Sequence, residues 1–234
     1  MYSNSIETTT YTYDRNGNQL SQTTLTVEAN GERQETIESS TFNAFNQLTT
    51  VVQNVKYNHG SVQHHKTTHY AYRADGLRRN IVANEIVTTY IWNGSYITAE
   101  HTNQNNRIIR YERCLSGRLL RSSHYGIYLY NVRSDVVQRI NPNGTTLQVY
   151  QYDAFGNELN SNSNDDNPFR YAGEYFDKET GTYYLRARRY NPRTGRFTQA
   201  DPFWNVNNMQ GSTNAILQAS NLYVYVMNNP LLCY

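Results

Sequence analysis

A short unit recurs along this chain of 234 residues and constrains its fold more than any other feature. The unit is an aromatic residue, then Asp or Asn, then a tight turn that usually contains Gly, then an aliphatic residue. Clear copies begin at Tyr13 (Y-D-R-N-G-N-Q-L), Phe42 (F-N-A-F-N-Q-L), Tyr72 (Y-R-A-D-G-L-R) and Tyr152 (Y-D-A-F-G-N-E-L). The first three are about 30 residues apart, and weaker copies follow at about 20 residues, beginning at Tyr90, Tyr111 and Tyr130. Such periods indicate one supersecondary unit stacked many times.

The unit has the chemistry of a β-hairpin. The Asp14 carboxylate can accept hydrogen bonds from the backbone that follows it and so open a type I turn, and Gly17 can take the positive φ of the bulge after the turn. Asp153 and Gly156 repeat this spacing. Tyrosines stand two apart before the turns, so each pair shares one face of a strand: Tyr11 with Tyr13, Tyr70 with Tyr72, Tyr150 with Tyr152. We expect hairpins laid side by side with tyrosines in cross-strand ladders, and a generic antiparallel β-sandwich as the alternative.

The kind of hydrophobic residue favours an open sheet over a dry core. Tyrosine, with 22 copies, supplies much of the 38% hydrophobic content. Residues 67–73 (T-T-H-Y-A-Y-R) place Thr and Tyr where a sandwich would carry Val, Ile or Leu. A tyrosine ring can pack while its hydroxyl stays in water. The sequence therefore predicts a broad, curved sheet with water near both faces.

Composition and charge exclude several classes of protein. The length allows one domain or two. No apolar run approaches the roughly 20 residues of a membrane-spanning helix, and polar residues follow Met1, so no signal peptide is expected. The net charge is only +2 and basic residues form no stripe, so nucleic acid is not an expected partner. Cys114 and Cys233 are too few for a disulfide framework and are predicted to be free thiols.

The composition changes after the strand-rich region. Residues 161–167 (S-N-S-N-D-D-N) contain no apolar side chain and predict an exposed loop. The block that follows, residues 167–202, has turns at 177–181 and 191–195, with Arg186 and Arg188 expected on one side of a strand. Residues 205–220 predict one short helix, and residues 221–230 a final strand followed by a turn.

The repeated units and the block at 167–202 together resemble the Rhs/YD-repeat family, at the end of its repeat region and its Rhs repeat-associated core domain. The resemblance covers residues 11–230. Its most specific segments are Y-Y-L-R-A-R from Tyr183, P-R-T-G-R-F from Pro192, Asp201-Pro202, and N-L-Y-V-Y-V-M-N-N-P from Asn221. The residues that carry the family signature are Tyr152, Asp153, Gly156, Tyr171, Gly173, Tyr184, Arg186, Arg188, Gly195, Arg196, Phe197, Asp201, Pro202, Asn229 and Pro230. Arg189 and Asn191 depart from it, because the family usually has Tyr and Asp there.

The resemblance implies a mainly-β fold in which antiparallel hairpin repeats form part of a curved or spiralling β-sheet shell. Residues 1–160 would be the YD-repeat strand region, and residues 161–234 the core domain, truncated at its C-terminal end. The implied role is a non-catalytic shell segment of a polymorphic-toxin-type protein that encapsulates or presents a C-terminal effector absent from this chain. Its partners would be the rest of a longer shell and that toxin domain. The parent would be secreted or at the cell surface, and the chain expressed alone would stay in the cytoplasm.

Two other functions stay open at this point. One is a carbohydrate-binding or cell-surface adhesion module that uses exposed tyrosines to stack on glycans. The other is a self-cleaving aspartate autoprotease, because family cores often cut themselves with two Asp-Pro aspartates, one acting as base and one as acid. Asp201 matches the first aspartate, but only four residues follow Pro230 and none is Asp. We therefore expect no self-cleavage, and Asp201 as a structural remnant.

The sequence predicts neither a cofactor nor a metal ion. The histidines cluster near a turn, but no Cys accompanies them and neighbours on a strand alternate faces, so solvated strand histidines are favoured: His59, His64, His65 and His69. Asn93-Gly94-Ser95 and Asn143-Gly144-Thr145 fit a glycosylation acceptor, but Asn-Gly is also a strong hairpin-turn signal and is preferred as such.

Two further predictions concern ion pairs made by the arginines and association through the sheet edges. Arg186, Arg188, Arg193 and Arg196 lie close in sequence to Asp177, Glu179 and Asp201. An ion-pair network is favoured there over a binding cleft. Exposed edge strands are expected to allow self-association.

Overall fold

The computed structural model describes residues 5–203 and 220–230, which form two compact units, Met1–Thr88 and Thr89–Tyr234. The boundary falls within strand β7 (Ile86–Asn93). Hydrogen bonding follows chain order from β1 to β13, and four further strands form a second sheet. The division into units rests on compactness and does not test the boundary predicted near residue 160, which stays a prediction. None of the helices in the described residues is long and apolar enough to span a membrane.

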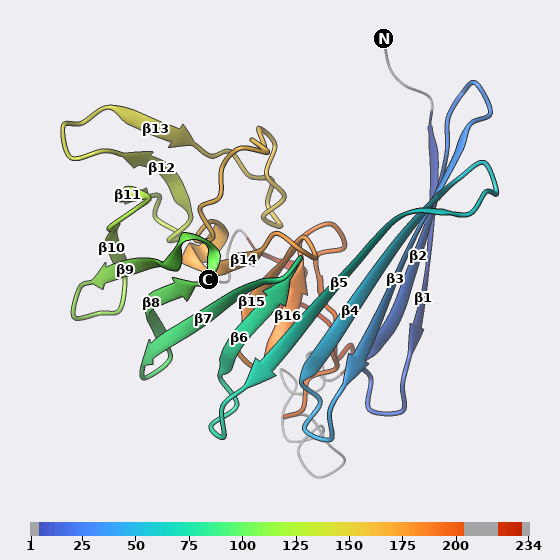
Figure 1. The fold of residues 1–234 in the computed structure, drawn as a ribbon, viewed down its shortest axis with the longest axis horizontal. Coiled ribbons are helices and arrows are strands. Elements are labelled where there is room, and N and C mark those ends of the chain that lie inside the picture. The colour runs from blue at the N-terminus through green and yellow to red at the C-terminus, as the bar shows by residue number, and fades with distance from the viewer. Residues whose placement is uncertain (1–4, 204–219, 231–234) are drawn as a thin grey trace. The chain divides into compact units, whose positions relative to one another are not determined.

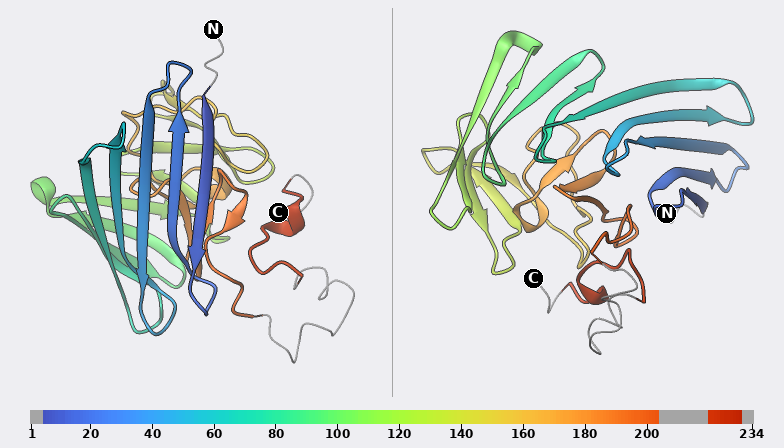
Figure 2. Two further views of the ribbon diagram at one scale, coloured as in Figure 1. Left: turned by 90° about the vertical axis from the view of Figure 1, so that its right-hand side faces the viewer. Right: turned by 90° about the horizontal axis from the view of Figure 1, so that it is seen from below.

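The first unit is a sheet of long antiparallel strands, seen in blue and teal in Figures 1 and 2. Its strands before β7 are β1 (Ile6–Tyr13), β2 (Gln19–Val27), β3 (Arg33–Phe42), β4 (Leu48–Tyr57), β5 (Val62–Tyr72) and β6 (Arg78–Ala83). Successive residues of β2 are half-buried whichever face they point to, so neither face is dry. Hydroxyl pairs such as Thr9 with Thr24, 3.1 Å apart, join the strands. This confirms the predicted mainly-β, antiparallel hairpin architecture.

The second unit contains shorter strands and short 3-10 helices (Figure 1). After β7 come β8 (Tyr96–Thr102), β9 (Arg107–Arg113), β10 (Leu119–Ser122), β11 (Gly126–Tyr130), β12 (Val136–Ile140) and β13 (Thr146–Val149). The second sheet contains β14 (Tyr175–Asp177), β15 (Thr182–Leu185), β16 (Arg188–Asn191) and β17 (Arg196–Phe197). The 3-10 helices are η1 (Gln104–Asn106), η2 (Tyr171–Gly173) and η3 (Val226–Asn228).

One backbone turn recurs in both units. The N–H of its first residue donates to the carbonyl of its fifth, and the N–H of its fourth donates to the carbonyl of its first; within the described ranges such turns begin at Asp14, Glu28, Asn43, Arg73, Cys114, Asn131, Asn141 and Asp153. The fourth residue has a positive φ, as Gly17 does at 77° and Gly156 at 88°. The register of the strand pair slips beside several of these turns, for example at Thr12/Tyr13. The predicted type I turn with a following bulge is therefore confirmed.

Where the first turn residue is Asp or Asn, its side chain stabilises this geometry. Oδ1 of Asp14 accepts the N–H groups of Asn16 and Asn18 at 2.9 and 2.8 Å. Oδ1 of Asp153 accepts those of Phe155 and Asn157 at 2.8 and 3.0 Å. The carboxylate thus satisfies two N–H groups that the bend leaves without a strand partner.

Turns about 30 residues apart contact one another in the first unit. Oδ1 of Asn46 accepts the side-chain amides of Asn16 and Asn18 at 3.0 and 2.9 Å. Further along, Nε2 of Gln47 lies 3.5 Å from the carbonyl oxygen of Gly76. Each repeat holds two strands, so every second turn returns to the same end of the sheet, which explains the spacing of the first three copies.

The predicted tyrosine ladders are wrong for the repeat hairpins. Tyr11 faces Gln22 across the strands, and Tyr70 faces Ile81. An aromatic ladder forms instead in the small second sheet, in the register Phe176, Tyr183, Tyr190, Phe197. Adjacent ring centroids there are 5.0, 6.4 and 5.9 Å apart. Consecutive short strands in that sheet each carry an aromatic residue at the matching position, whereas in the repeats the aromatic positions face polar or aliphatic ones.

Tyrosine supplies most of the interior of the second unit. Its buried tyrosines are Tyr90, Tyr111, Tyr125, Tyr128, Tyr150, Tyr171, Tyr183, Tyr184 and Tyr190. Their hydroxyls find acceptors: that of Tyr190 donates to the carbonyl of Phe155 at 2.8 Å, and that of Tyr171 to the carbonyl of Ala154 at 3.0 Å. Burying the ring while bonding the hydroxyl avoids the cost of an unsatisfied polar group.

Two local predictions in the C-terminal part are wrong. Arg186 and Arg188 do not share one side of a strand, because Arg186 has a φ of 57° and lies in the turn between β15 and β16. Residues 221–230 do not form a strand: Val224 makes a single bridge to Arg196, and Val226–Asn228 form η3 with positive φ values. The Tyr225 ring packs 4.1 Å from that of Tyr190, and this contact draws the segment away from an extended path. The predicted helix at 205–220 lies outside the described residues except for its last residue.

Gly156 and Gly144 provide a matched test of the turn. Both have a positive φ, 88° and 89°, but a Cβ on Gly156 would lie 2.6 Å from the Tyr171 ring, whereas one on Gly144 meets nothing within 4 Å. Gly144→Ala should cost about 1–2 kcal/mol of folding free energy from backbone strain. Gly156→Ala should cost about 1–3 kcal/mol more, because the ring must move. Urea unfolding of both variants measures the difference, and equal losses would contradict the packing role of Gly156.

Candidate functional site

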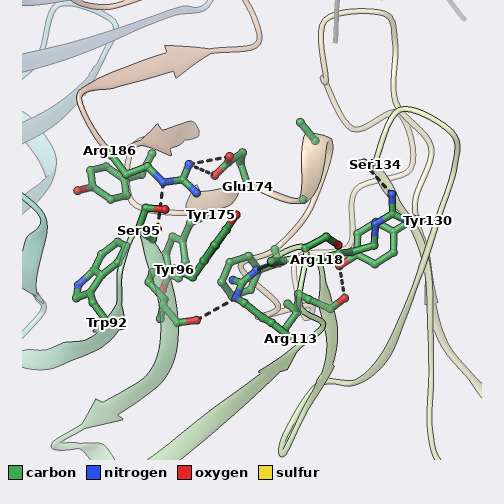
Figure 3. Close-up of a pocket in the computed structure, with 18 residues that line it drawn as sticks. Trp92, Ser95, Tyr96, Arg113, Arg118, Tyr130, Ser134, Glu174, Tyr175 and Arg186 are labelled. Atoms are coloured by element: carbon green, nitrogen blue, oxygen red, sulfur yellow. Dashed lines mark hydrogen bonds and ion pairs between the residues drawn. The ribbon is translucent and has the colours of Figure 1, made fainter.

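The second unit contains a cavity of about 400 Å³ where several turns converge (Figure 3). The turn between β7 and β8 contributes Ser95, Tyr96 begins β8, and the turn between β9 and β10 contributes Ser116, Gly117 and Arg118. The rest of the wall consists of Trp92, Ile97, Arg113, Leu119, Tyr130, Ser134, Phe169, Ala172, Gly173, Glu174, Tyr175, Tyr184 and Arg186.

Arg113 lies near two aromatic rings. The centre of its guanidinium lies 5.1 Å from the ring centroids of both Tyr96 and Phe169. Its Nε donates to the carbonyl of Ile97 at 3.3 Å, and its Nη1 to that of Gly117 at 2.9 Å. Burial lowers the pKa of Arg113 from its usual value. The position of this cation is therefore set by rings and carbonyl groups.

Arg118 and Tyr130 form a second cation–ring pair in the wall. The Arg118 guanidinium lies 5.4 Å from the Tyr130 ring centroid, and its Nη2 is 3.4 Å from Oγ of Ser134 (Figure 3). The Tyr130 hydroxyl donates to the carbonyl of Leu119 at 2.7 Å. Burial raises the pKa of Tyr130, so the hydroxyl stays protonated at neutral pH.

The carboxylate of Glu174 is already paired. Nη1 of Arg186 lies 2.7 and 2.6 Å from its two oxygens, and Nε of Arg186 is 3.3 Å from the carbonyl oxygen of Ser95 (Figure 3). Within the described part of the chain, Arg113 and Arg118 form no ion pair with a carboxylate. The cavity thus carries two cations without a direct ion pair, although the Glu174 charge opposes the effect of burial on the pKa of Arg113.

This cavity was not predicted from the sequence, although the repeats contain one signal for it. The position just before the turn is aromatic in the clear copies, as at Tyr13, Phe42, Tyr72 and Tyr152. In the turn that begins at Cys114 the same position holds Arg113. A charged residue at an aromatic position of a repeat marks a copy with a separate role.

A second polar cluster, also in the second unit, is buried and structural. Arg139 forms an ion pair with Asp165, and its Nε donates to the Tyr150 hydroxyl at 2.7 Å. That hydroxyl donates to Oδ2 of Asp165 at 2.5 Å. Asn167 joins the cluster by accepting the Tyr128 hydroxyl at 2.6 Å. The predicted exposed loop at 161–167 is confirmed for residues 161–164 and 166. It is wrong for Asp165 and Asn167, which are 7% and 0% exposed.

Arg170 fastens the same loop from the other side. Its Nε donates to the carbonyl of Asn167 at 3.0 Å, and its Nη2 to that of Asp165 at 2.9 Å. Nη1 lies 2.6 Å from the carboxylate of Glu158. Burial raises the pKa of Glu158, and the Arg170 charge opposes this shift. The loop lacks apolar side chains because buried hydrogen bonds and ion pairs hold it.

Asp201 lies in a turn. Its Oδ1 accepts the N–H of Phe203 at 2.9 Å, and its own N–H donates to the carbonyl of Leu222 at 2.9 Å. Oδ2 lies 3.1 Å from Nη2 of Arg188. The Arg188 guanidinium also lies 3.6 Å from the centroid of the Phe197 ring. The ion pair between Arg188 and Asp201 is part of the predicted network, whereas Arg186 pairs with Glu174, which the prediction did not include.

The structure divides the family-signature residues into two sets. Those that line the cavity are Gly173, Tyr184 and Arg186. Six others do not line the cavity and instead form turns or pack in the second unit: Tyr152, Asp153, Gly156, Tyr171, Arg188 and Asp201. Gly195 lies close to the Phe155 ring, where a Cβ would be 2.9 Å away. Arg196 and Phe197 form β17, Pro202 follows Asp201, and Asn229 and Pro230 follow η3.

The histidines and the Asn-Gly sites lie outside the cavity. His65 Nδ1 is 2.8 Å from Oδ1 of Asn54, and His69 Nδ1 is 3.2 Å from Oγ1 of Thr50. His59 is exposed and lies 3.2 Å from the Arg33 guanidinium, and His64 is exposed on β5. Residues 5–203 and 220–230 contain no cluster of three metal-ligating side chains.

The Asn-Gly pairs and one cysteine match their predictions. Gly94 and Gly144 have φ values of 56° and 89° in hairpin turns, as expected of Asn93-Gly94 and Asn143-Gly144. Cys114 is a free thiol, and Cys233 lies outside the described residues.

Antiparallel hairpins joined by Asp- or Asn-capped turns, and followed by a small aromatic sheet, define a YD-repeat protein. The chain belongs to the teneurin YD-shell family, whose model matches residues 1–231. This confirms the resemblance seen in the repeats and in the core block.

The curated relatives are much longer proteins. The tRNA3(Ser)-specific nuclease WapA of Bacillus spizizenii is 33% identical over 255 residues, covering 95% of this chain and 10% of that protein. The tRNA nuclease WapA of Bacillus subtilis is 32% identical over the same shares. Toxin protein Tse5 of Pseudomonas aeruginosa is 37% identical over 67 residues, 29% of this chain and 4% of that protein. The chain thus spans a tenth or less of the length of these relatives.

Solved structures share the fold. The crystal structure of TcdB2-TccC3-TEV superposes on 96% of this chain and 13% of that chain, with a TM-score of 0.55 and 19% identity. The Photorhabdus luminescens Tc holotoxin pore gives 97% and 13%, with a TM-score of 0.55 and 17% identity. The predicted shell-type sheet is therefore supported by fold as well as by family.

Removing a carboxylate from the buried cluster should destabilise the protein much more than removing one from a surface ion pair. Asp165→Ala leaves Arg139 buried without its counter-ion and should cost about 3–5 kcal/mol of folding free energy. Glu112→Ala removes the exposed partner of Arg121 and should change stability little. Thermal and urea unfolding of both variants measure the contrast. A small loss for Asp165→Ala would show that the cluster does not hold the loop.

Proposed function

We propose that this chain is a non-catalytic section of shell wall in a longer Rhs or polymorphic-toxin-type protein, where it encapsulates or presents a C-terminal effector. The observation that carries the proposal is the match of residues 1–231 to the YD-shell family, together with the hairpin repeats of the structure. A wall needs strands that pair in chain order and turns that stack, and the first unit has both. In this proposal residues 161–234 act as the core domain that ends the repeat region.

The names of the relatives support a toxin context. Two of them are named tRNA nucleases and one a toxin protein. The chain matches about a tenth of each nuclease, so we assign the nuclease activity of those proteins to parts outside the matched segment. The proposed partners are accordingly the rest of the shell and an effector, and the proposed location is outside the cell or at its surface.

The size of the native polypeptide tests this role. Antibodies against the chain should detect, in the cells that make it, a polypeptide larger than 27.2 kDa. In that protein the effector should resist added protease until denaturant unfolds the shell. The isolated chain should leave tRNA intact. Detection of a 27.2 kDa species alone, or cleavage of tRNA by the purified chain, would contradict the proposal.

We also propose that the chain does not cleave itself. The Asp201 carboxylate is engaged by Arg188 and by the N–H of Phe203, which supports a structural role for it. Mass spectrometry of the purified chain after prolonged incubation should show the intact mass. Asp201→Asn is the control: fragments at one bond in the original chain that disappear in this variant would establish autoproteolysis.

A further inference from the structure

Arg113 and Arg118 are cations in a concave site, and among the described residues neither forms a direct ion pair. Glu174, the carboxylate that acts on Arg113 at longer range, is paired with Arg186. Arg113 uses two of its five N–H groups for the carbonyls of Ile97 and Gly117. Arg118 makes one long contact, to Ser134. Arg113 is half-buried, and a partly buried charge is unfavourable unless it is paired, so its place beside the exposed Arg118 is suited to an anion.

The aromatic rings hold these guanidinium groups in place. The Tyr96 and Phe169 rings both contact the Arg113 guanidinium, and the Tyr130 ring contacts that of Arg118. Little side-chain freedom is then left to lose when a ligand binds.

Charge and size narrow the class of ligand. Three arginines face one glutamate in the wall, and Arg186 already pairs with that glutamate. A volume of about 400 Å³ lies in the range of small-molecule sites. The half-buried rings of Trp92 and Tyr175 also line the cavity, so the ligand should carry an apolar portion.

A carboxylate fits this wall better than a phosphate. The guanidinium fork binds either group through paired N–H···O bonds. Free phosphate has no apolar portion to contact the rings in the wall, whereas an organic carboxylate can use both the arginines and the rings.

We propose that this cavity is a binding site for a carboxylate carried on a compact apolar group, with Arg113 and Arg118 as the groups that contact the carboxylate. The acid can be an acidic residue of a polypeptide or a free organic acid. The proposal depends only on the geometry of the cavity and stands apart from the proposed shell function.

Titration calorimetry of the full chain tests the proposal with four probes. N-acetyl-Glu-Phe-amide represents the polypeptide source, and N-acetyl-Gln-Phe-amide is its uncharged match. Benzoate represents a free organic acid, and inorganic phosphate is the contrasting anion. We expect the Glu peptide or benzoate to bind, the Gln peptide to bind at least about tenfold more weakly than the Glu peptide, and added salt to weaken binding.

Variants assign the binding to the cavity. Arg118→Ala, an exposed position, should weaken binding of the carboxylate probe about tenfold or more. Arg113→Lys keeps the charge but loses the planar fork and should also weaken it. Arg121→Ala is the matched control, because Arg121 is exposed on β10 and does not line the cavity, and should leave binding unchanged. Circular dichroism and thermal unfolding verify that each variant is folded.

The outcomes separate clearly. Binding of the Glu peptide alone supports a polypeptide source, and binding of benzoate alone supports a free organic acid. Binding of phosphate alone overturns the carboxylate assignment. Absence of binding by all four probes, equal binding of the Glu and Gln peptides without binding of benzoate, or equal loss in Arg118→Ala and Arg121→Ala overturns the site.

Discussion

The structure depends on one local interaction, the turn in which an Asp or Asn side chain accepts backbone N–H groups while the fourth residue takes a positive φ. Asp14 and Asp153 show it with the same partners and nearly the same distances, although they lie at opposite ends of the repeat region. The turn reverses the chain within a few residues, so each strand pairs with the strand that precedes it. A sheet assembled in this way can grow without a long-range connection.

Tyrosine allows this sheet to be stable without a dry aliphatic core. A buried ring contributes apolar contact, and its hydroxyl reaches a carbonyl or an amide at the edge of the packed region, as Tyr190 and Tyr128 do. The free-energy cost of burying each hydroxyl is therefore offset by the hydrogen bond that the same residue makes. In the first unit, where strands are half-buried along both faces, hydroxyl pairs between threonines serve the same purpose.

Arginine has three distinct roles in the second unit. Arg139 and Arg170 hold the loop at 161–167 through buried carboxylates and carbonyls. Arg188 secures the turn at Asp201. Arg113 is instead fixed by rings and carbonyls and keeps donors available to the cavity. The physical difference is the partner: a carboxylate satisfies the charge, whereas a ring or a carbonyl orients it and leaves it largely uncompensated.

The sequence by itself determined the antiparallel hairpins, the positions of the Gly turns and the family, because each depends on residues within a few positions of one another. Asp14 with Gly17, and Asn143 with Gly144, are local signals that act wherever the rest of the chain lies. Only the tertiary structure decided that Asp165 is buried, that the aromatic ladder runs through Tyr183 and Tyr190, and that Arg113 meets Phe169. These depend on pairing between segments distant in sequence, where the free energy of burial outweighs the local preference of a polar loop or a repeat.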